Sequence, residues 1–549
     1  MARGARRAGM AGCWGMLLGL LAFFAAGGAW AQDALVVDSD KASVQATYAS
    51  GQPVDFKLKS EPGEKIWLLL QAEATGATRL ARPSDAYAQA NGGFLFPFSF
   101  EDGSLADNAD ELFYVESASS APISLVGQDL TGLGRATVSV MKGEPSSTFG
   151  LDPVQTVTLV EGPPLDEEVA SGLQEALDST VALYRRAGGA LAVRFPDGRV
   201  WAGASGVADL ETGEPVEVDD RFRIGSITKT FTGTVVLQLA QEGVLSLDDT
   251  VGKWLPGRLD HGDRITIRQL MYHTGGIDNY WHLGNDLYME FLEDRTTELT
   301  HNQVLEETNK MGLVAEPGTE FYYSNGGPVI EAMIVEAATG EAMETQVTNR
   351  IFKVLDMSRS VFPSAETMPA PHVQGYFDFD QSGVLMDNAT EDITFVNPSC
   401  GWASGAVVTS VTDLLTWGKA LVDGDLLDEE YQRERLTMVD AAPGFKSGLH
   451  IFDDHGFLGH KGDFFGFQAT VQRYEGYTFA AIVNTQYVEG VDPPDPQGNV
   501  AHLTFIAALP VLGLEVPQGA VLETASRRRE AAFPADPKWL AGGLNEYVF

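Results

Sequence analysis

Ser226 and Lys229 are a pair of residues whose types and spacing could do chemistry together. They precede an apolar run from Val235 to Ala240, and Gly243 follows that run. This pattern predicts a buried helix that begins around Ser226 and stops at Gly243. Helical residues three positions apart share a face. The sequence therefore predicts an amine beside a hydroxyl.

This pairing would suit nucleophilic catalysis. A serine hydroxyl is a weak nucleophile at neutral pH and needs a base within hydrogen-bonding reach. Lys229 could be that base if burial or neighbouring positive charge keeps its amine neutral. At the start of a helix, the backbone N–H of Ser226 would also be free to bind an oxyanion.

The spacing by itself is weak support, because Ser139 and Lys142 repeat it. That copy lies in a strand-like segment, where residues three apart point to opposite faces, so we interpret it as chance. An ordinary helix N-cap is the alternative role for Ser226. The prediction for Ser226 thus depends on further motifs.

A second motif combines Tyr323 and Asn325 in the sole Tyr-x-Asn of the chain. The phenol could relay a proton, and the carboxamide could hold both Lys229 and a substrate amide. A packed core tyrosine and a turn asparagine are the alternatives. Together with Ser226 and Lys229, the motif predicts a second side of one site.

A third motif, His460-x-Gly462-Asp463, enters a strand that is expected to start near Gly466. Gly462 would let a substrate approach the strand edge, and the backbone N–H of Asp463 could be the second oxyanion donor. His460 could supply a polar or positive group, with a structural histidine as the alternative.

These three motifs, in this order, resemble the serine hydrolases related to class C β-lactamases and penicillin-binding DD-peptidases. The resemblance extends from about residue 165 to 512 and includes the flanking segments 222–226, 245–249, 265–270 and 321–325. It implies that Ser226 is the acylated nucleophile and that Lys229 and Tyr323 share the base and acid roles. It also implies that Asn325 orients the substrate and that His460 replaces the lysine of class C β-lactamases.

His273 is a rival for the third motif, because His273-Thr274-Gly275 is closer to the Lys-Thr-Gly form of the family. It follows an apparent helix and precedes Tyr323, whereas the third motif of the family follows the second and lies on a strand. We therefore favour His460. Lys461 and Asp463 depart from the small or hydroxyl residues usual in the family, and we expect them to influence substrate choice.

The fold class expected from the resemblance is α+β (α/β), class C β-lactamase-like, with an antiparallel sheet, flanking helices and an inserted helical region. Short strand-like segments before it suggest an all-β accessory module. We expect a signal peptide at 1–31, the β-rich accessory domain at 33–160, a linker at 161–165, the hydrolase domain at 166–512 and a C-terminal tail at 513–549.

The first residues have three arginines, an apolar stretch from Met16 to Ala26 and the small-x-small end Ala29-Trp30-Ala31. We interpret them as a secretory signal, with a membrane anchor as the alternative. We therefore predict an exported protein, periplasmic or secreted, without a membrane span after processing. Only Cys400 remains beyond this signal, so no intramolecular disulfide is expected.

Composition narrows the function further. The net charge is −39, which disfavours nucleic acid and anionic lipid as partners. The nine histidines lack the spacing of a metal site, so no metal or cofactor is expected. The absence of Gly-x-Ser-x-Gly argues against an α/β-hydrolase. For Trp402 we expect a core role, with pocket lining as the alternative.

The predicted function is hydrolysis through an acyl-enzyme on Ser226, with D-alanyl cell-wall peptides as the first substrate class. The predicted partners are therefore a small molecule or peptide, including peptidoglycan. An esterase, a D-amino-acid amidase and a β-lactamase are alternatives on the same residues. A second class of hypothesis is a binding or scaffolding protein without turnover, whose N-terminal module holds an envelope partner.

Overall fold

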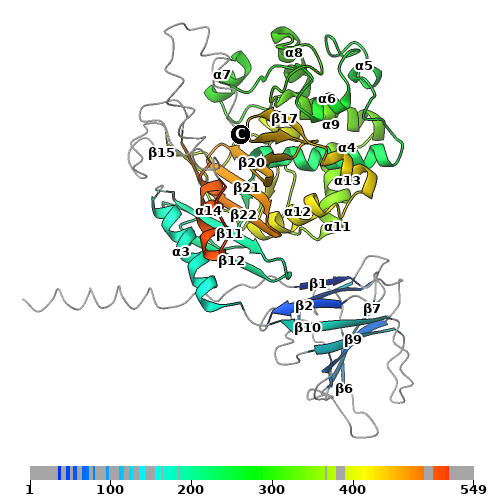
Figure 1. Ribbon diagram of the computed structural model, residues 1–549, viewed down its shortest axis with the longest axis vertical. Coiled ribbons are helices and arrows are strands. Elements are labelled where there is room, and N and C mark those ends of the chain that lie inside the picture. Colours follow the sequence, from blue (N-terminus) through cyan, green and yellow to red (C-terminus); the bar gives the residue numbers. More distant parts are fainter. Residues whose placement is uncertain are drawn as a thin grey trace, which may run out of the picture. The chain divides into compact units, whose positions relative to one another are not determined.

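The computed structural model describes residues 165–183, 186–282, 285–364, 368–378, 390–487 and 499–517, together with the backbones of ten strands before residue 163 (Figure 1). The predicted signal peptide and most of the predicted tail lie outside these residues. In the described part of the chain, no helix is both long and apolar enough to cross a membrane.

The ten N-terminal strands form two sheets. One has the order β1-β3-β8, and the other has the order β2-β10-β9-β4-β7-β6, with β5 paired to β4. Segments expected to be strands fall in β3, β4, β6 and β9. A separate accessory domain stays a prediction. Strand β10 extends to Gly162 and so includes the first two residues of the predicted linker. The bounds are β1 Leu35–Asp38, β2 Gln45–Ala49, β3 Val54–Leu58, β4 Lys65–Ala72, β5 Thr78–Leu80, β6 Phe94–Pro97, β7 Glu111–Glu116, β8 Ile123–Gln128, β9 Arg135–Lys142 and β10 Gln155–Gly162.

The C-terminal region is organised around an eight-stranded antiparallel sheet with the order β12-β11-β22-β21-β20-β19-β18-β17. Strand β11 pairs with β22, in the register Leu191↔Ala481. The sheet therefore joins strands from both ends of this region, and it is antiparallel as the resemblance implied. The bounds are β11 Gly188–Arg194, β12 Val200–Gly206, β17 Val439–Ala442, β18 Phe445–Ser447, β19 Phe452–Asp454, β20 Phe457–Phe464, β21 Phe467–Tyr474 and β22 Tyr477–Val483.

Helices cover both faces of this sheet (Figure 1). Helices α3 (Glu167–Leu183) and α14 (Val500–Ala508) share one apolar cluster with the sheet, which includes Leu173 and Leu177 of α3, Phe479 of β22 and Phe505 of α14. A short 3-10 helix, Pro510–Leu512, follows α14. On the opposite face, α12 (Val411–Asp423) packs on β11, β21 and β22.

Most of the helical region is inserted between β12 and β17. Helix α4 (Thr228–Gln241) is its centre, because every residue except two glutamines is buried. The helix prediction for this segment is confirmed, with the end two residues before Gly243. The other helices are α5 Val251–Trp254, α6 Ile267–Met271, α7 Asp286–Glu293, α8 His301–Met311, α9 Gly326–Thr339, α10 Met343–Val347, α11 Lys353–Leu355 and α13 Glu429–Arg435, with a π-helix at Thr348–Phe352.

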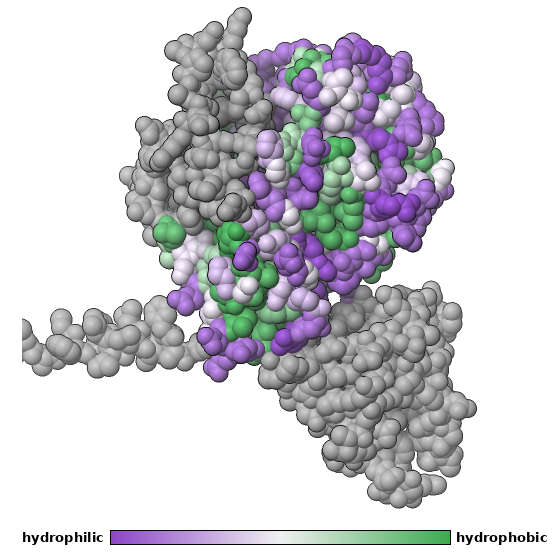
Figure 2. All heavy atoms as spheres, viewed as in Figure 1, coloured by the Kyte–Doolittle hydropathy of each residue, from purple (hydrophilic) through white to green (hydrophobic). Residues whose placement is uncertain are grey.

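Short strands and 3-10 turns complete the described fold. Strand β13 pairs with β16, and β14 pairs with both β15 and β23. Their bounds are β13 Phe222–Arg223, β14 Tyr376–Asp378, β15 Thr390–Asp392, β16 Val408–Thr409 and β23 Thr485–Tyr487, and the 3-10 turns span Gly225–Ile227, Pro398–Cys400 and Trp402–Ser404. The visible face of the described region is largely hydrophilic, with apolar residues in separate patches (Figure 2).

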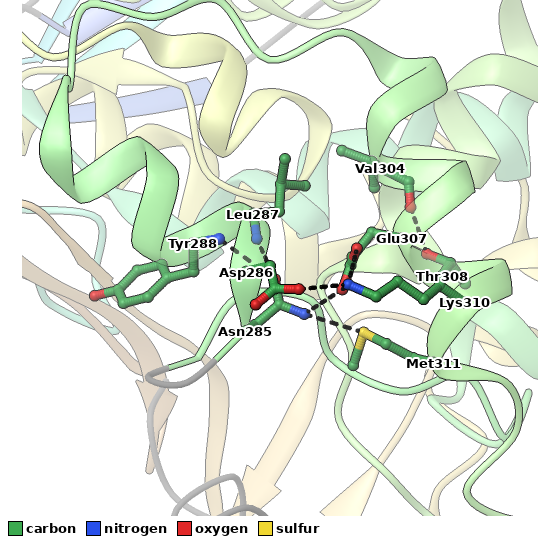
Figure 3. A network of polar contacts seen from close by, with 9 residues as sticks. All are labelled: Asn285, Asp286, Leu287, Tyr288, Val304, Glu307, Thr308, Lys310 and Met311. Atoms are coloured by element: carbon green, nitrogen blue, oxygen red, sulfur yellow. Dashed lines mark hydrogen bonds and ion pairs between the residues drawn. The ribbon is translucent and has the colours of Figure 1, made fainter.

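Asn285 ties α7 to α8 (Figure 3). Its side-chain oxygen caps α7 by accepting from the N–H groups of Leu287 and Tyr288, and its Nδ2 donates to Glu307 Oε1 over 2.8 Å. Lys310 adds an ion pair to the exposed Asp286. Asn285 is only 6% exposed, and both the oxygen and the nitrogen of its carboxamide have hydrogen-bond partners within the protein.

Replacing Asn285 with alanine is expected to lower the free energy of unfolding by about 1–2 kcal/mol, because the helix cap and the bond to Glu307 are both lost. Urea unfolding would measure this change. The control is Asp286→Ala, which removes a solvent-exposed ion pair and should leave unfolding nearly unchanged. Equal losses in the two variants would contradict the assignment.

Candidate active site

Ser226 lies in the 3-10 turn Gly225–Ile227 that leads directly into α4. Its side chain is on the inner side of the fold, and the residue is 9% exposed. Gly225 before it has φ = +50°, a left-handed conformation that favours glycine. The sequence predicted that a helix starts here. In the structure Ser226 lies in a 3-10 turn, and the α-helix begins two residues later, at Thr228.

The Lys229 amine contacts three acceptors. Its Nζ lies 2.9 Å from Ser226 Oγ, 2.7 Å from Asn325 Oδ1 and 2.9 Å from the carbonyl oxygen of Ser404. A neutral amine has two N–H donors and one lone pair. If Asn325 and Ser404 accept the two hydrogens, the lone pair is left for the Ser226 hydroxyl. This geometry suits a base that receives the serine proton.

The surroundings of Lys229 favour that neutral form. The residue is fully buried. Burial lowers the pKa of its amine well below the ordinary value, because the charged form loses its hydration, while the negative charge of Glu331 opposes the shift. Lys229 can therefore lose its proton at a lower pH than an exposed lysine.

Tyr323 and Asn325 precede α9, and Asn325 is the residue before its first turn. The Nδ2 of Asn325 donates to Asn279 Oδ1 over 3.1 Å, while its Oδ1 accepts from Lys229. The ring of Tyr323 lies beneath the amine, with Nζ 4.8 Å from the ring centroid. The structure thus brings the second motif to the first, and Asn279 orients it.

Tyr323 is 4% exposed. Burial raises the pKa of its phenol, the interaction with the Ser226 side chain acts in the opposite direction, and the charge of Asp463 adds to the rise. The phenol therefore keeps its proton at neutral pH. This state suits a proton donor or relay and leaves the role of base to Lys229.

Strand β20 packs its backbone directly against the Ser226 turn. A Cβ atom at Gly462 would clash with the carbonyl oxygen of Ile224 and would lie 2.9 Å from the Ser226 nitrogen. A Cβ atom at Gly225 would lie 2.6 Å from the Asp463 nitrogen. The two glycines thus bring the N–H groups of Ser226 and Asp463 close together, as a pair of oxyanion donors requires.

His460 lies on β20 and is 1% exposed. Its Nδ1 has a short contact with the Lys461 carbonyl oxygen, and its ring packs on Phe452 at a centroid distance of 4.7 Å. Burial lowers the pKa of this imidazole well below its usual range, and the charge of Lys229 lowers it further. Of the two roles predicted for His460, a polar or a positive group, this shift favours the polar one.

The side chains of Lys461 and Asp463 point away from Ser226. Side chains alternate along β20, so these two lie on the face opposite to Gly462. Lys461 forms an ion pair with Asp454 at 2.8 Å, and Asp463 accepts from Gln468 and from Asn499, the N-cap of α14. Both side chains therefore have partners on this face of β20, and their influence on substrate choice stays a prediction.

His273, the rival for the third motif, packs against Tyr323. Its ring packs on the Tyr323 ring at 4.5 Å, and its Nδ1 accepts from the Ser324 N–H over 3.3 Å. It follows α6 and belongs to no strand. The structure therefore places His460, and not His273, on the strand beside Ser226.

Sequence reasoning missed several groups around the site. The Ser404 carbonyl and the Asn279 side chain hold Lys229 and Asn325, but the chain of 549 residues has no local pattern that marks such partners. Glu331 is a buried carboxyl whose charge raises the pKa of Lys229, and its place within the apolar helix α9 is the only sequence signal that could have identified it. Trp402, 4% exposed, is bonded to Glu344 and stacked on His301, in agreement with a core role.

The chain matches the family described as Beta-lactamase over residues 173–502, more than half of its length. It is 33% identical to the esterase EstB of Burkholderia gladioli, with 41% of this chain and 60% of the relative covered. It is 32% identical to penicillin-binding protein 4 of Amycolatopsis lactamdurans, with 46% and 63% covered. The chain thus spans about three-fifths of the length of these curated relatives.

A solved structure of similar fold is the D-stereospecific amidohydrolase from a Streptomyces species. It is 33% identical, covers 57% of this chain and 94% of its own, and has a TM-score of 0.51. Together with the family match, this similarity supports the fold expected from the sequence, an antiparallel sheet with flanking helices. The chain belongs to the β-lactamase family of serine hydrolases, among the relatives of class C β-lactamases.

Proposed function

We propose that this protein hydrolyses an amide or ester through an acyl-enzyme on Ser226. The observation that carries the proposal is the buried Lys229 amine, 2.9 Å from Ser226 Oγ and held by two further acceptors. A base in this position can take the hydroxyl proton as the oxygen attacks a carbonyl carbon. A scaffold without turnover would have no need to keep a desolvated amine there.

The chemistry proceeds in two halves. Ser226 Oγ forms a bond to the carbonyl carbon while its proton passes to Lys229, and the N–H groups of Ser226 and Asp463 bind the oxyanion. The bond to the leaving group then breaks, and the proton returns to that group through Tyr323. In the second half, a water molecule attacks the acyl-enzyme, Lys229 and Tyr323 move its proton to Ser226 Oγ, and the acid is released.

The third motif bears on the substrate. His460 is neutral, and the Lys461 amine is held by Asp454 on the other face of β20. Neither side chain presents a positive charge to Ser226. This arrangement favours an ester or an amino-acid amide as substrate. Such a substrate has no free carboxylate next to the reacting carbonyl, so it needs no cation in the site to bind one. The D-stereospecific amidohydrolase and the esterase among the relatives support this substrate class.

D-alanyl cell-wall peptides are the second candidate, and the similarity to penicillin-binding protein 4 favours them. This candidate requires the export that we predict from residues 1–31, because only an exported enzyme would reach peptidoglycan. A D-alanyl-D-alanine end carries a free carboxylate beside the reacting amide. The two candidates therefore differ in one charged group of the substrate.

The nucleophile is tested by covalent labelling. A fluorophosphonate probe should attach to the wild-type protein at Ser226 and fail to attach to Ser226→Ala, because the hydroxyl beside the Lys229 amine is then lost. Mass spectrometry of peptic fragments would locate the adduct. Ser139→Ala is the matched control, since it removes the serine of the chance Ser-x-x-Lys copy, and its labelling should equal that of the wild type. Equal labelling of Ser226→Ala would end the proposal.

The pH dependence follows from the Lys229 amine. Because burial lowers its pKa, the base form persists to a lower pH than an exposed lysine would allow, and activity should be lost as the pH falls through that depressed pKa. Lys229→Met is expected to lower kcat/KM about 10²–10⁴-fold, the usual loss of a general base. Hydrolysis of a nitrophenyl ester across pH would measure both. Activity confined to strongly alkaline buffer would contradict a depressed pKa.

The substrate class is tested with a matched pair, acetyl-D-alanyl-D-alanine and its C-terminal amide. The neutral site should give a kcat/KM about tenfold higher for the amide, since the carboxylate finds no charge-assisted hydrogen bond. The corresponding L-alanyl compounds serve as the stereochemical control. Faster cleavage of the free carboxylate would favour the D-alanyl peptide candidate, with Ser226 labelling unaffected.

A further inference from the structure

A cluster of buried polar side chains lies next to Tyr323. It consists of His273, His450 and Glu331, which are 3%, 0% and 0% exposed. None of the three is needed for the acyl-transfer steps. Buried ionisable groups carry a desolvation cost, so a cluster of them beside a reacting centre calls for a role.

His273 contacts Tyr323 and both of its neighbours. Its carbonyl oxygen accepts from the Tyr322 N–H over 2.7 Å, and its Nδ1 accepts from the Ser324 N–H over 3.3 Å. Its ring lies against the Tyr323 ring at a centroid distance of 4.5 Å and an angle of 32°. One residue thus fixes the backbone on both sides of Tyr323 and one face of its ring.

These contacts require a neutral His273. A protonated imidazole would carry a hydrogen on Nδ1 and could not accept from Ser324. Burial lowers the pKa of His273 well below its usual range, and a positive charge on His450, Lys229 or His460 would lower it further. The backbone of His273 has φ = +55°, a region that asparagine also tolerates.

Glu331 and His450 support His273 from behind. His450 Nε2 lies 2.8 and 3.0 Å from the two carboxyl oxygens of Glu331, on α9. The His450 ring meets the His273 ring edge to face at 5.2 Å, and its backbone N–H donates to the Met271 carbonyl oxygen. A contact chain therefore connects α9 to Tyr323 through two imidazole rings.

The same cluster touches α4 below Lys229. Gly233 lies one turn after Lys229, and a Cβ atom there would come within 2.9 Å of His450 Cδ2. The groups that interact with Glu331 are His450, from the loop before β19, and Lys229, from α4. His273, from the loop after α6, and His460, from β20, interact in turn with His450 and Lys229. Glu331 contributes the negative charge among these basic groups.

We propose that Glu331, His450 and His273 are positioning residues that hold the Tyr323 ring against the Lys229 amine. This inference rests on the proposed roles of Ser226, Lys229 and Tyr323. It adds that Tyr323 is held in place by a buried unit built from α9, the loop after α6 and the loop before β19. The unit acts through Tyr323 and Lys229 and does not contact the substrate.

The first test compares His273→Phe with His273→Asn. Phenylalanine keeps an aromatic ring but loses the acceptor for Ser324, so the acylation rate constant should fall about 10–100-fold with KM little changed, because the reacting groups are misplaced. Asparagine places Oδ1 where Nδ1 stood and should recover most of the rate. His261→Phe is the matched control, an exposed histidine with φ = +62°.

The second test uses Glu331→Gln, which keeps the size and an acceptor for His450 but removes the charge. Without that charge, which raises the Lys229 pKa, the acid limb of the pH–rate profile should move to lower pH. An unmoved limb, or wild-type acylation in His273→Phe, would overturn the inference. Failure of the proposed function is distinguishable, because the wild-type protein itself would then not be labelled at Ser226.

Discussion

The structure depends on one buried amine. Lys229 is fully enclosed, and three oxygens, from Ser226, Asn325 and Ser404, surround its Nζ at 2.7 to 2.9 Å. These oxygens come from the turn before α4, the start of α9 and a 3-10 turn far along the chain. Burial makes the ammonium costly, and the three partners make the neutral amine useful. The helices packed around α4 both bury the Lys229 amine and bring its three acceptors to it.

The second constraint is the close packing of the sheet against this turn. Gly225 and Gly462 face each other's backbones where a side chain would clash, so β20 can present the Asp463 N–H beside that of Ser226. In the sheet that contains β20, the pairing of β11 with β22 joins the N-terminal strands to the C-terminal strands. The position of a single N–H group therefore depends on strands from both ends of the region.

The electrostatic balance of the site also follows from burial. Lys229, His273 and His460 all have pKa values lowered by the loss of hydration. Glu331 is the buried carboxylate that opposes this trend at Lys229. The outcome is a base of depressed pKa over the ring of a protonated phenol, a state that suits activation of the serine.

The sequence alone was sufficient for the parts of the site that depend on local spacing. The i, i+3 relation of Ser226 and Lys229, the Tyr323-x-Asn325 motif and the strand with His460 and Gly462 are local patterns, and the family follows from their order. Only the tertiary structure decided which face of β20 each side chain takes, and it turned Lys461 and Asp463 away from the site. It also decided the partners Asn279, Ser404, Glu331 and His450, because contacts between distant segments leave no periodic mark in the chain. Protonation depends on burial in the same way, since desolvation arises only when the segments pack together.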